Sequence, residues 1–247
     1  MLLDTPKTRI AFNRTGGNGP EAMFCGGFRS NMAGTKALAL EAHCAATGRA
    51  FTRFDYRGHG ESDGKFIDGT IGDWLEDAVA VLDRVAQGPV VLVGSSMGAW
   101  IALLAARARP DRVKGLVLVA PAVDFTEALI WDRLPAAARA TLEREGVWLR
   151  ESDYVDEPDQ ITLRLIEEGR KHLLLGRPIA FDGPVRILHG MEDQTVPWQF
   201  ATRTAEALTS EDVTVTLVKN GDHRLSDDES LSRLMGAIDE AAARIAL

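Results

Sequence analysis

Cysteine is scarce in this sequence, which argues against a secreted protein held together by disulfides. The 247 residues include two cysteines, Cys25 in an apolar run and Cys44 in a helical pattern. Both positions are typical of buried free thiols, and two such thiols form no disulfide framework, which fits a reducing cytoplasm. The first residues, Met1 to Pro6, also lack the charged and apolar regions of a signal peptide. We therefore expect a cytoplasmic protein.

An excess of basic residues is missing as well. Lys and Arg number 28 against 36 Asp and Glu, which gives a formal net charge of −8 at pH 7. Nucleic acids and anionic membrane surfaces bind clusters of Lys and Arg, so neither is an expected partner. The acidic balance is explained by the solvation of an ordinary surface.

Long apolar runs are limited to one segment. Residues 89–106 carry no charged side chain over 18 positions, the lower limit for a membrane helix. Residues 94–98 interrupt this run with two glycines and two serines, and residues 90–93 have the composition of a strand. A buried strand followed by a buried helix explains the segment, so we expect no membrane insertion. Metal-ligand spacings, dinucleotide fingerprints and phosphate-binding loops are also absent, which predicts no metal and no cofactor.

What the sequence does contain is a repeated alternation of short apolar runs and helical patterns. The expected strands cover residues 9–13, 22–25, 50–54, 90–93, 115–119, 185–189 and 213–217. The expected helices cover residues 34–46, 71–86, 97–109, 195–208 and 228–246. Apolar runs without polar alternation are typical of strands covered on both faces, and their alternation with helices predicts an α/β fold with a mostly parallel sheet. Ligands bind such sheets at the carboxyl ends of the strands.

One stretch departs from this alternation. Residues 121–183 show no convincing strand, and their best helical patterns cover residues 134–145 and 160–175. We interpret the stretch as a helical cap inserted between two strands of the sheet. The whole chain, residues 1–247, is then a single domain with a lid, and its length suffices for one large core.

A candidate nucleophile lies at the junction between a strand and a helix. Residues 94–98 read Gly-Ser-Ser-Met-Gly, which has the form Gly-x-Ser-x-Gly. In this motif a sharp turn raises the serine hydroxyl above the sheet edge, and the glycines allow close approach of neighbouring elements. Ser95 lacks the glycine framing. The motif therefore assigns the nucleophile to Ser96.

A serine nucleophile needs a base, and His223 is the candidate. It follows the last expected strand, and the order along the chain in this architecture is serine, acid, histidine. We expect different roles for the remaining four histidines: His43 and His172 as surface or packing residues, His59 in a glycine-rich turn, and His189 committed to the loop after its strand.

The acid that orients the base has several candidates. Asp193 follows the expected strand 185–189 and is the preferred choice, because a carboxylate there can hold the imidazole in the correct tautomer. Asp124 follows the preceding strand and is a genuine rival. Glu192 is one residue nearer the strand, and Asp222 is too near His223 in sequence to orient it well.

Backbone donors and a substrate pocket complete the expected site. The Met97 N–H follows the nucleophile, and the loop after strand 22–25 offers a second donor, for which Phe28 is preferred to Arg29. Together they predict an oxyanion hole. The expected cap supplies apolar candidates for an acyl pocket, although such residues also pack a cap onto its body: Phe125, Leu129, Trp131, Leu142 and Trp148.

These motifs together resemble the α/β-hydrolase superfamily from about residue 24 to residue 223. The matching pieces are Gly-Gly-Phe at 26–28, Asp-Tyr-Arg-Gly-His-Gly-Glu-Ser at 55–62, the serine motif at 94–98, His-Gly-Met-Glu-Asp at 189–193 and Asp-His at 222–223. Within the superfamily the chain resembles the branch of mitochondrial palmitoyl-protein thioesterases that also hydrolyse acyl glucuronides. That likeness adds residues 34–39, 145–148, 196–198 and 222–224.

The resemblance implies a cap after the sixth strand and a triad at Ser96, Asp193 and His223. It implies hydrolysis of esters or thioesters through an acyl-enzyme, with a small molecule or an acylated protein as substrate. C–C bond hydrolysis or perhydrolysis on the same triad is the alternative, because the fold alone does not separate these reactions. A non-catalytic binding module is disfavoured, because all three triad residues are present.

Overall fold

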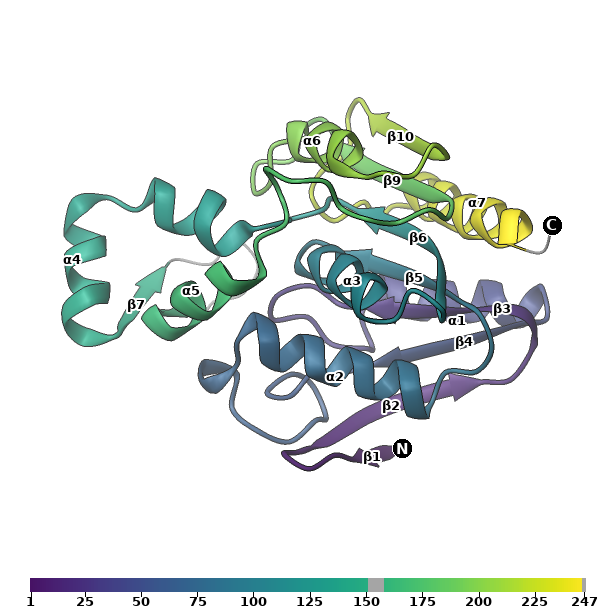
Figure 1. The fold of residues 1–247 in the computed structure, drawn as a ribbon, viewed down its shortest axis with the longest axis horizontal. Helices are drawn as coiled ribbons and strands as arrows, with labels where there is room; N and C mark the ends of the chain where they lie inside the picture. The colour runs from purple at the N-terminus through teal and green to yellow at the C-terminus, as the bar shows by residue number, and fades with distance from the viewer. Residues whose placement is uncertain (151–157, 246–247) are drawn as a thin grey trace.

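In the computed structural model, residues 1–150 and 158–245 are described, and eight strands of this part form one sheet (Figure 1). The spatial order is β1-β2-β4-β3-β5-β6-β9-β10. The strands are β1 (Leu2–Asp4), β2 (Arg9–Thr15), β3 (Asn18–Cys25), β4 (Arg49–Phe54), β5 (Val90–Ser95), β6 (Val113–Val119), β9 (Val185–Gly190) and β10 (Val213–Val218). From β4 to β10 neighbouring strands are parallel, while β1 and β2 add an antiparallel edge. The predicted mostly parallel sheet is confirmed.

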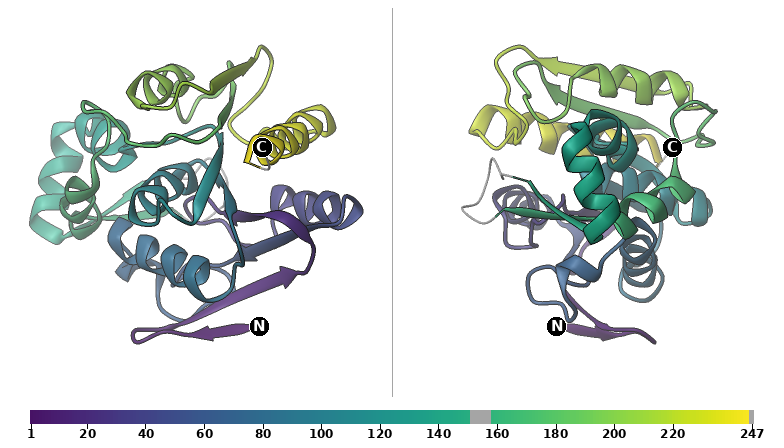
Figure 2. Two further views of the ribbon diagram at one scale, coloured as in Figure 1. Left: turned by 45° about the vertical axis from the view of Figure 1, so that its right-hand side comes forward. Right: turned by 90° about the vertical axis from the view of Figure 1, so that its left-hand side faces the viewer.

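Helices cover both faces of this sheet (Figure 2). The helices are α1 (Thr35–Ala46), α2 (Ile71–Arg84), α3 (Met97–Ala108), α6 (Gln199–Ala207) and α7 (Asp228–Ile245). Helices α1 and α7 pack on one face, and α2, α3 and α6 pack on the other. Val91 and Val93 of β5 face the first group, whereas Val90 and Leu92 face the second. Both sets are buried, which is why the strand reads as an unbroken apolar run.

Two elements differ in detail from the sequence prediction. Strand β1 is too short and too exposed to leave a pattern in the sequence. Helix α6 begins at Gln199 rather than at Thr195, because the N–H groups of Thr195 and Val196 both donate to the Asp193 side chain at 2.8 Å. That arrangement keeps the start of the expected helix in a loop.

The segment between β6 and β9 contains short helices and a small hairpin, and it extends from one end of the sheet (Figure 1). A π-helical turn covers Thr126–Ile130 and single 3₁₀ turns cover Trp131–Arg133 and Arg170–His172. The longer helices are α4 (Ala136–Glu145) and α5 (Leu163–Gly169). The expectation of no strand here is wrong, because β7 (Val147–Arg150) pairs antiparallel with β8 (Asp159–Thr162). Strands of four residues are too short for a period-2 signal.

The topology brings the candidate site residues to one edge of the sheet. Strands β3, β5, β9 and β10 all end at this edge, and the paired positions Cys25 with Gly94 and Val218 with Gly190 show that their ends are level. Ser96, Asp193 and His223 follow three of these ends. No helix in the described ranges is long and apolar enough to span a bilayer.

Candidate active site

Ser96 lies in a strained turn between β5 and α3. Its backbone has φ 57° and ψ −119°, in a region that L-residues rarely occupy and that costs about 1–3 kcal/mol. The flanking glycines are required by close approach: a Cβ on Gly98 would lie 2.1 Å from the Cys25 carbonyl oxygen, and one on Gly94 would lie 2.4 Å from that of Gly98. The first contact places the turn directly against the end of β3, and the second places β5 directly against the start of α3.

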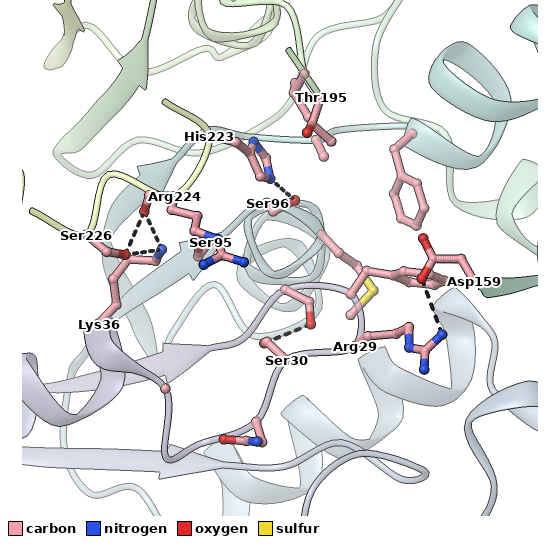
Figure 3. A pocket seen from close by; sticks show the side chains of 18 of the residues that line it. Arg29, Ser30, Lys36, Ser95, Ser96, Asp159, Thr195, His223, Arg224 and Ser226 are labelled. Carbon is pink, nitrogen blue, oxygen red and sulfur yellow. Dashed lines mark hydrogen bonds and ion pairs between the residues drawn. The ribbon is translucent and has the colours of Figure 1, made fainter. Parts of the chain in front are cut away.

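The side chains of Ser96, His223 and Asp193 form a continuous hydrogen-bonded chain (Figure 3 shows its first link). The Ser96 hydroxyl lies 3.1 Å from Nε2 of His223, and Nδ1 of His223 lies 2.7 Å from Oδ2 of Asp193. The carboxylate accepts from Nδ1–H, so Nε2 carries the lone pair that faces the Ser96 hydroxyl. This arrangement matches the requirements for a serine nucleophile with an oriented base.

The Asp193 carboxylate is buried and has four hydrogen-bond donors. Oδ1 accepts from the N–H groups of Thr195 and Val196, and Oδ2 accepts from His223 and from Nε2 of His189 at 3.0 Å. Burial alone would raise the pKa of Asp193, but the bonds from His189 and His223 outweigh it and hold the pKa well below its usual range. Asp193 is therefore ionised at neutral pH.

His189 has the structural position that the sequence predicts for it. The ring is fully buried, and its Nε2 faces both Asp193 Oδ2 and the Val196 carbonyl oxygen, each at 3.0 Å. Because both neighbours are acceptors, Nε2 carries the proton. The ring thus contacts two residues of the loop after β9, Asp193 and Val196, and shares Oδ2 of Asp193 with His223.

The rival acids have other contacts in the structure. Both oxygens of Asp124 accept backbone N–H groups, from Leu174 and Leu175 at 2.8 Å, so this carboxylate joins the two ends of the inserted segment. Asp222 accepts the Leu225 N–H at 2.8 Å within its own loop, and Glu192 is exposed. The structure brings His223 together with Asp193.

His59 distinguishes between Phe28 and Arg29, the two candidates for the second donor of the oxyanion hole. Its Nδ1 lies 3.2 Å from the Arg57 carbonyl oxygen, and its Nε2 accepts the Arg29 N–H at 3.3 Å. Burial lowers the pKa of His59 to about 4, so the ring is neutral at physiological pH and able to accept. The backbone N–H of Arg29 therefore already donates to His59. Within the described ranges the N–H groups of Phe28 and Met97 have no hydrogen-bond acceptor, which leaves both available to an oxyanion.

A cavity of about 410 Å³ opens above Ser96. Phe125 and Leu129 of the inserted segment line it, but Trp131 and Trp148 are not among the described residues of its wall. The Trp131 ring contacts two guanidinium groups, whose central carbons lie 4.5 Å (Arg139) and 4.7 Å (Arg170) from the ring centroid. Leu142 is fully buried away from the cavity. Trp131, Leu142 and Trp148 therefore do not line the cavity, and the structure gives no support for the prediction that they contact the substrate.

The charged part of this wall was not predicted from the sequence. Arg29 and Arg150 both contact the Asp159 carboxylate, at 3.4 Å and 2.7 Å, and Lys36 contacts Arg224 and Ser226 in the loop after His223 (Figure 3). Asp159 thus links Arg29, in the loop after β3, to the β7–β8 hairpin. The two ends of this link are 130 residues apart in the chain, so no local pattern predicts it. No cluster of three metal-ligating side chains occurs in residues 1–150 and 158–245.

Fold and relatives together define the class of protein. The family model described as serine aminopeptidase, S33, matches residues 23–172, and the chain belongs to this family of α/β-hydrolases. It is an enzyme that hydrolyses ester or thioester bonds.

Two sets of similar proteins make the relationship more specific. The palmitoyl-protein thioesterases ABHD10 of Bos taurus and Homo sapiens are 42% and 40% identical over 232 residues, which is 94% of this chain and 76% of theirs. The crystal structure of a protein from Agrobacterium vitis, described as a hydrolase, has 41% identity and a TM-score of 0.93, covering 98% of this chain and 97% of that one. The mouse α/β-hydrolase domain-containing protein 10 has 39% identity and a TM-score of 0.90, covering 97% and 96%. The resemblance found in the sequence is confirmed.

The predicted cytoplasmic localisation is wrong by the same comparison. The relatives of 40–42% identity are named as mitochondrial proteins. Free buried thiols distinguish reducing from oxidising surroundings, and they do not separate the cytoplasm from another reducing compartment.

Proposed function

We propose that this enzyme cleaves carboxylic esters or thioesters through an acyl-enzyme on Ser96. The observation that carries the proposal is the hydrogen-bonded chain from the Ser96 hydroxyl through His223 to the ionised Asp193, placed at the wall of a cavity. In the proposed reaction His223 Nε2 takes the hydroxyl proton as Ser96 attacks the carbonyl carbon. The proton then passes from Nε2 to the departing alcohol or thiol. Water, activated by the same nitrogen, releases the acid.

The tetrahedral intermediate needs stabilisation of its oxyanion, which we assign to the Phe28 and Met97 N–H groups. Phe28 is well anchored for this role, because its ring packs edge-on against Phe66, Trp74 and Phe125 at centroid distances of 4.8, 5.9 and 5.6 Å. A preorganised donor costs no reorganisation during the reaction, and one such donor is worth about 10²–10³ in kcat.

Covalent labelling tests the proposal directly. A fluorophosphonate probe is expected to modify the wild-type enzyme stoichiometrically, and peptide mapping is expected to place the label on Ser96. A p-nitrophenyl ester is expected to give a burst of nitrophenol when deacylation is the slower step. Labelling at another serine, or hydrolysis by an enzyme whose Ser96 stays unlabelled, would contradict the acyl-enzyme mechanism.

The substrate proposed here is an acylated thiol or alcohol with an apolar acyl chain. Relatives named palmitoyl-protein thioesterase support a thioester, and the apolar part of the cavity wall supports an acyl group: Met97, Ala122, Phe125, Leu129 and Ile130. Whether the acyl donor is a protein or a small molecule, the same acyl contacts would apply.

A series of substrates with increasing acyl-chain length is expected to reveal binding of the acyl chain by this apolar wall. Each buried methylene contributes about 0.8 kcal/mol, so two added carbons should raise kcat/KM roughly tenfold while apolar wall remains, and the rise should then stop. The measurement is kcat/KM for matched p-nitrophenyl esters and acyl thioesters from acetyl to palmitoyl. A flat or falling profile in both series would exclude acyl selection by the inserted segment.

A pair of leucine variants tests whether the dependence of kcat/KM on chain length arises at the cavity wall. Leu129 lines the cavity, so Leu129→Ala is expected to flatten the chain-length profile by removing apolar contact. Leu149 lies in β7 of the same inserted segment with 57% exposure, and Leu149→Ala is the matched control that should keep the wild-type profile. Equal effects of the two variants would mean that the segment acts through its overall stability.

A further inference from the structure

The loop that carries His223 is short and conformationally demanding. It joins β10 to α7, and Leu225 within it has φ 44°, in the left-handed region that disfavours L-residues. Two contacts stabilise it internally: the Leu225 N–H donates to Asp222 at 2.8 Å, and the Leu225 side chain is buried in the core between α1 and α7. A strained loop keeps one conformation only when its surroundings hold it there.

Lys36 holds this loop from a different part of the chain. It lies in the first turn of α1, and its ammonium donates to the backbone carbonyl oxygen of Arg224 and, at 3.4 Å, to the Ser226 hydroxyl (Figure 3). The contact bridges 188 residues of sequence. Arg224 directly follows His223, so the bond holds the carbonyl group of the residue next to His223.

The surroundings of Lys36 indicate that this contact has a purpose beyond solvation. Burial lowers the pKa of Lys36 to about 8, with the Asp222 carboxylate opposing that shift and the Arg224 guanidinium adding to it. The Asp222 carboxylate offsets part of the loss of hydration, and the ammonium is directed to two acceptors in the loop that follows His223. A lysine that served only solubility would extend into water.

We propose that Lys36 is a positioning residue for His223, holding the Asp222–Ser226 loop so that Nε2 stays within hydrogen-bonding distance of Ser96. The inference rests on the proposed function and adds to it a residue outside the triad. The imidazole must remain close to both Ser96 and Asp193, at 3.1 and 2.7 Å in this structure. A misplacement of about 1 Å at a reacting group costs about 10²-fold in rate.

Lys36→Met is the central test, because methionine keeps the apolar stem and removes the three N–H donors. Its kcat is expected to fall by about 10- to 100-fold, while KM stays close to the wild-type value. The rate of fluorophosphonate labelling should fall by the same factor, because it depends on the same base. Lys36→Arg retains a charged donor that can reach the Arg224 carbonyl oxygen, so it should recover most of the lost rate.

Two further variants separate positioning from folding. Lys114 also donates to a backbone carbonyl oxygen, that of Pro110 at 3.1 Å, but lies far along the chain from the site, so Lys114→Met is the matched control with wild-type kcat. Ser226→Ala removes the weaker of the two acceptors and should have a smaller effect than Lys36→Met. Helix α1 is held by Ala37, Leu40 and Cys44, so Tm of Lys36→Met should change by no more than about 2–4 °C.

The outcomes are distinguishable. A raised KM with unchanged kcat would overturn positioning, and so would a wild-type kcat in Lys36→Met. A rate loss that Lys36→Arg does not recover, accompanied by an equal change in Lys114→Met, would also overturn it. If Ser96→Ala keeps its activity, the proposed function itself fails. If Ser96→Ala is inactive and Lys36→Met is normal, only the role of Lys36 fails.

Discussion

Replacement of Ser96 by alanine is expected to abolish turnover while leaving the fold intact. The hydroxyl oxygen forms the acyl bond in the proposed mechanism, and it lies 3.1 Å from Nε2 of His223, the proposed base. Loss of the nucleophile in a well-studied serine hydrolase costs about 10⁶ in kcat, so a comparable fall is expected here. The substitution removes one atom and leaves the strained φ of 57° unchanged, because alanine and serine tolerate this region equally poorly.

The measurement is kcat on the best p-nitrophenyl ester, with circular dichroism and Tm to verify folding. Ser95→Ala is the neighbouring control. Ser95 ends strand β5 and also lines the cavity, but its side chain has no hydrogen bond to the triad among the described contacts. Ser95→Ala should therefore retain much of its activity. Retention of about a tenth of wild-type kcat by Ser96→Ala would rule out Ser96 as the nucleophile.

Asp193→Asn is expected to lower kcat by about 10⁴, the loss seen when a triad aspartate is replaced in the same way. An asparagine amide accepts through one terminal atom only, so two of the four donors lose their acceptor: Thr195 and Val196, or His189 and His223. If the amide nitrogen faces His223, the imidazole turns to the tautomer that carries its proton on Nε2. That tautomer cannot accept a proton from Ser96.

Asp124→Asn provides the comparison for this prediction. Its carboxylate accepts from Leu174 and Leu175, so the variant should lose stability where the inserted segment joins the sheet and keep most of its kcat. Steady-state kinetics with thermal unfolding of both variants would measure the two effects separately. The reverse ranking, with the larger fall in kcat for Asp124→Asn, would transfer the role of the acid to Asp124.

The parts of the fold and site that follow from local sequence were predictable. An unbroken apolar run followed by Gly-x-Ser-x-Gly specifies a buried strand, a sharp turn and a helix, and the structure has them at Val90–Ser95 and Met97–Ala108. Strand ends in a parallel sheet share one edge, so the placement of Asp193 and His223 near Ser96 also followed from chain order. Each of these inferences needed only the neighbours of a residue in sequence and one general rule of topology.

Contacts between distant side chains were not predictable in this way. The aromatic character of Trp131 indicates packing but does not specify the partners, which in the structure are the guanidinium groups of Arg139 and Arg170. Arg29 contacts Asp159, which is 130 residues away in the chain and also contacts Arg150. Lys36 contacts Arg224, in the loop after His223, across 188 residues. A carboxylate or an ammonium in the sequence has many possible partners, and only the folded geometry selects one.

The wide separation of the triad along the chain has a consequence in time. Ser96 and His223 are 127 residues apart, and the intervening sequence contains the inserted segment and β9. On the ribosome the turn with Ser96 is therefore synthesised well before the loop with Asp193, and His223 is synthesised after both. A nascent chain that has folded only as far as β6 contains Ser96 in its strained turn but lacks His223, the proposed base. Hydrolytic activity should begin only when β10 has joined β9. The time at which activity appears during cell-free translation would therefore report when the last steps of folding are complete.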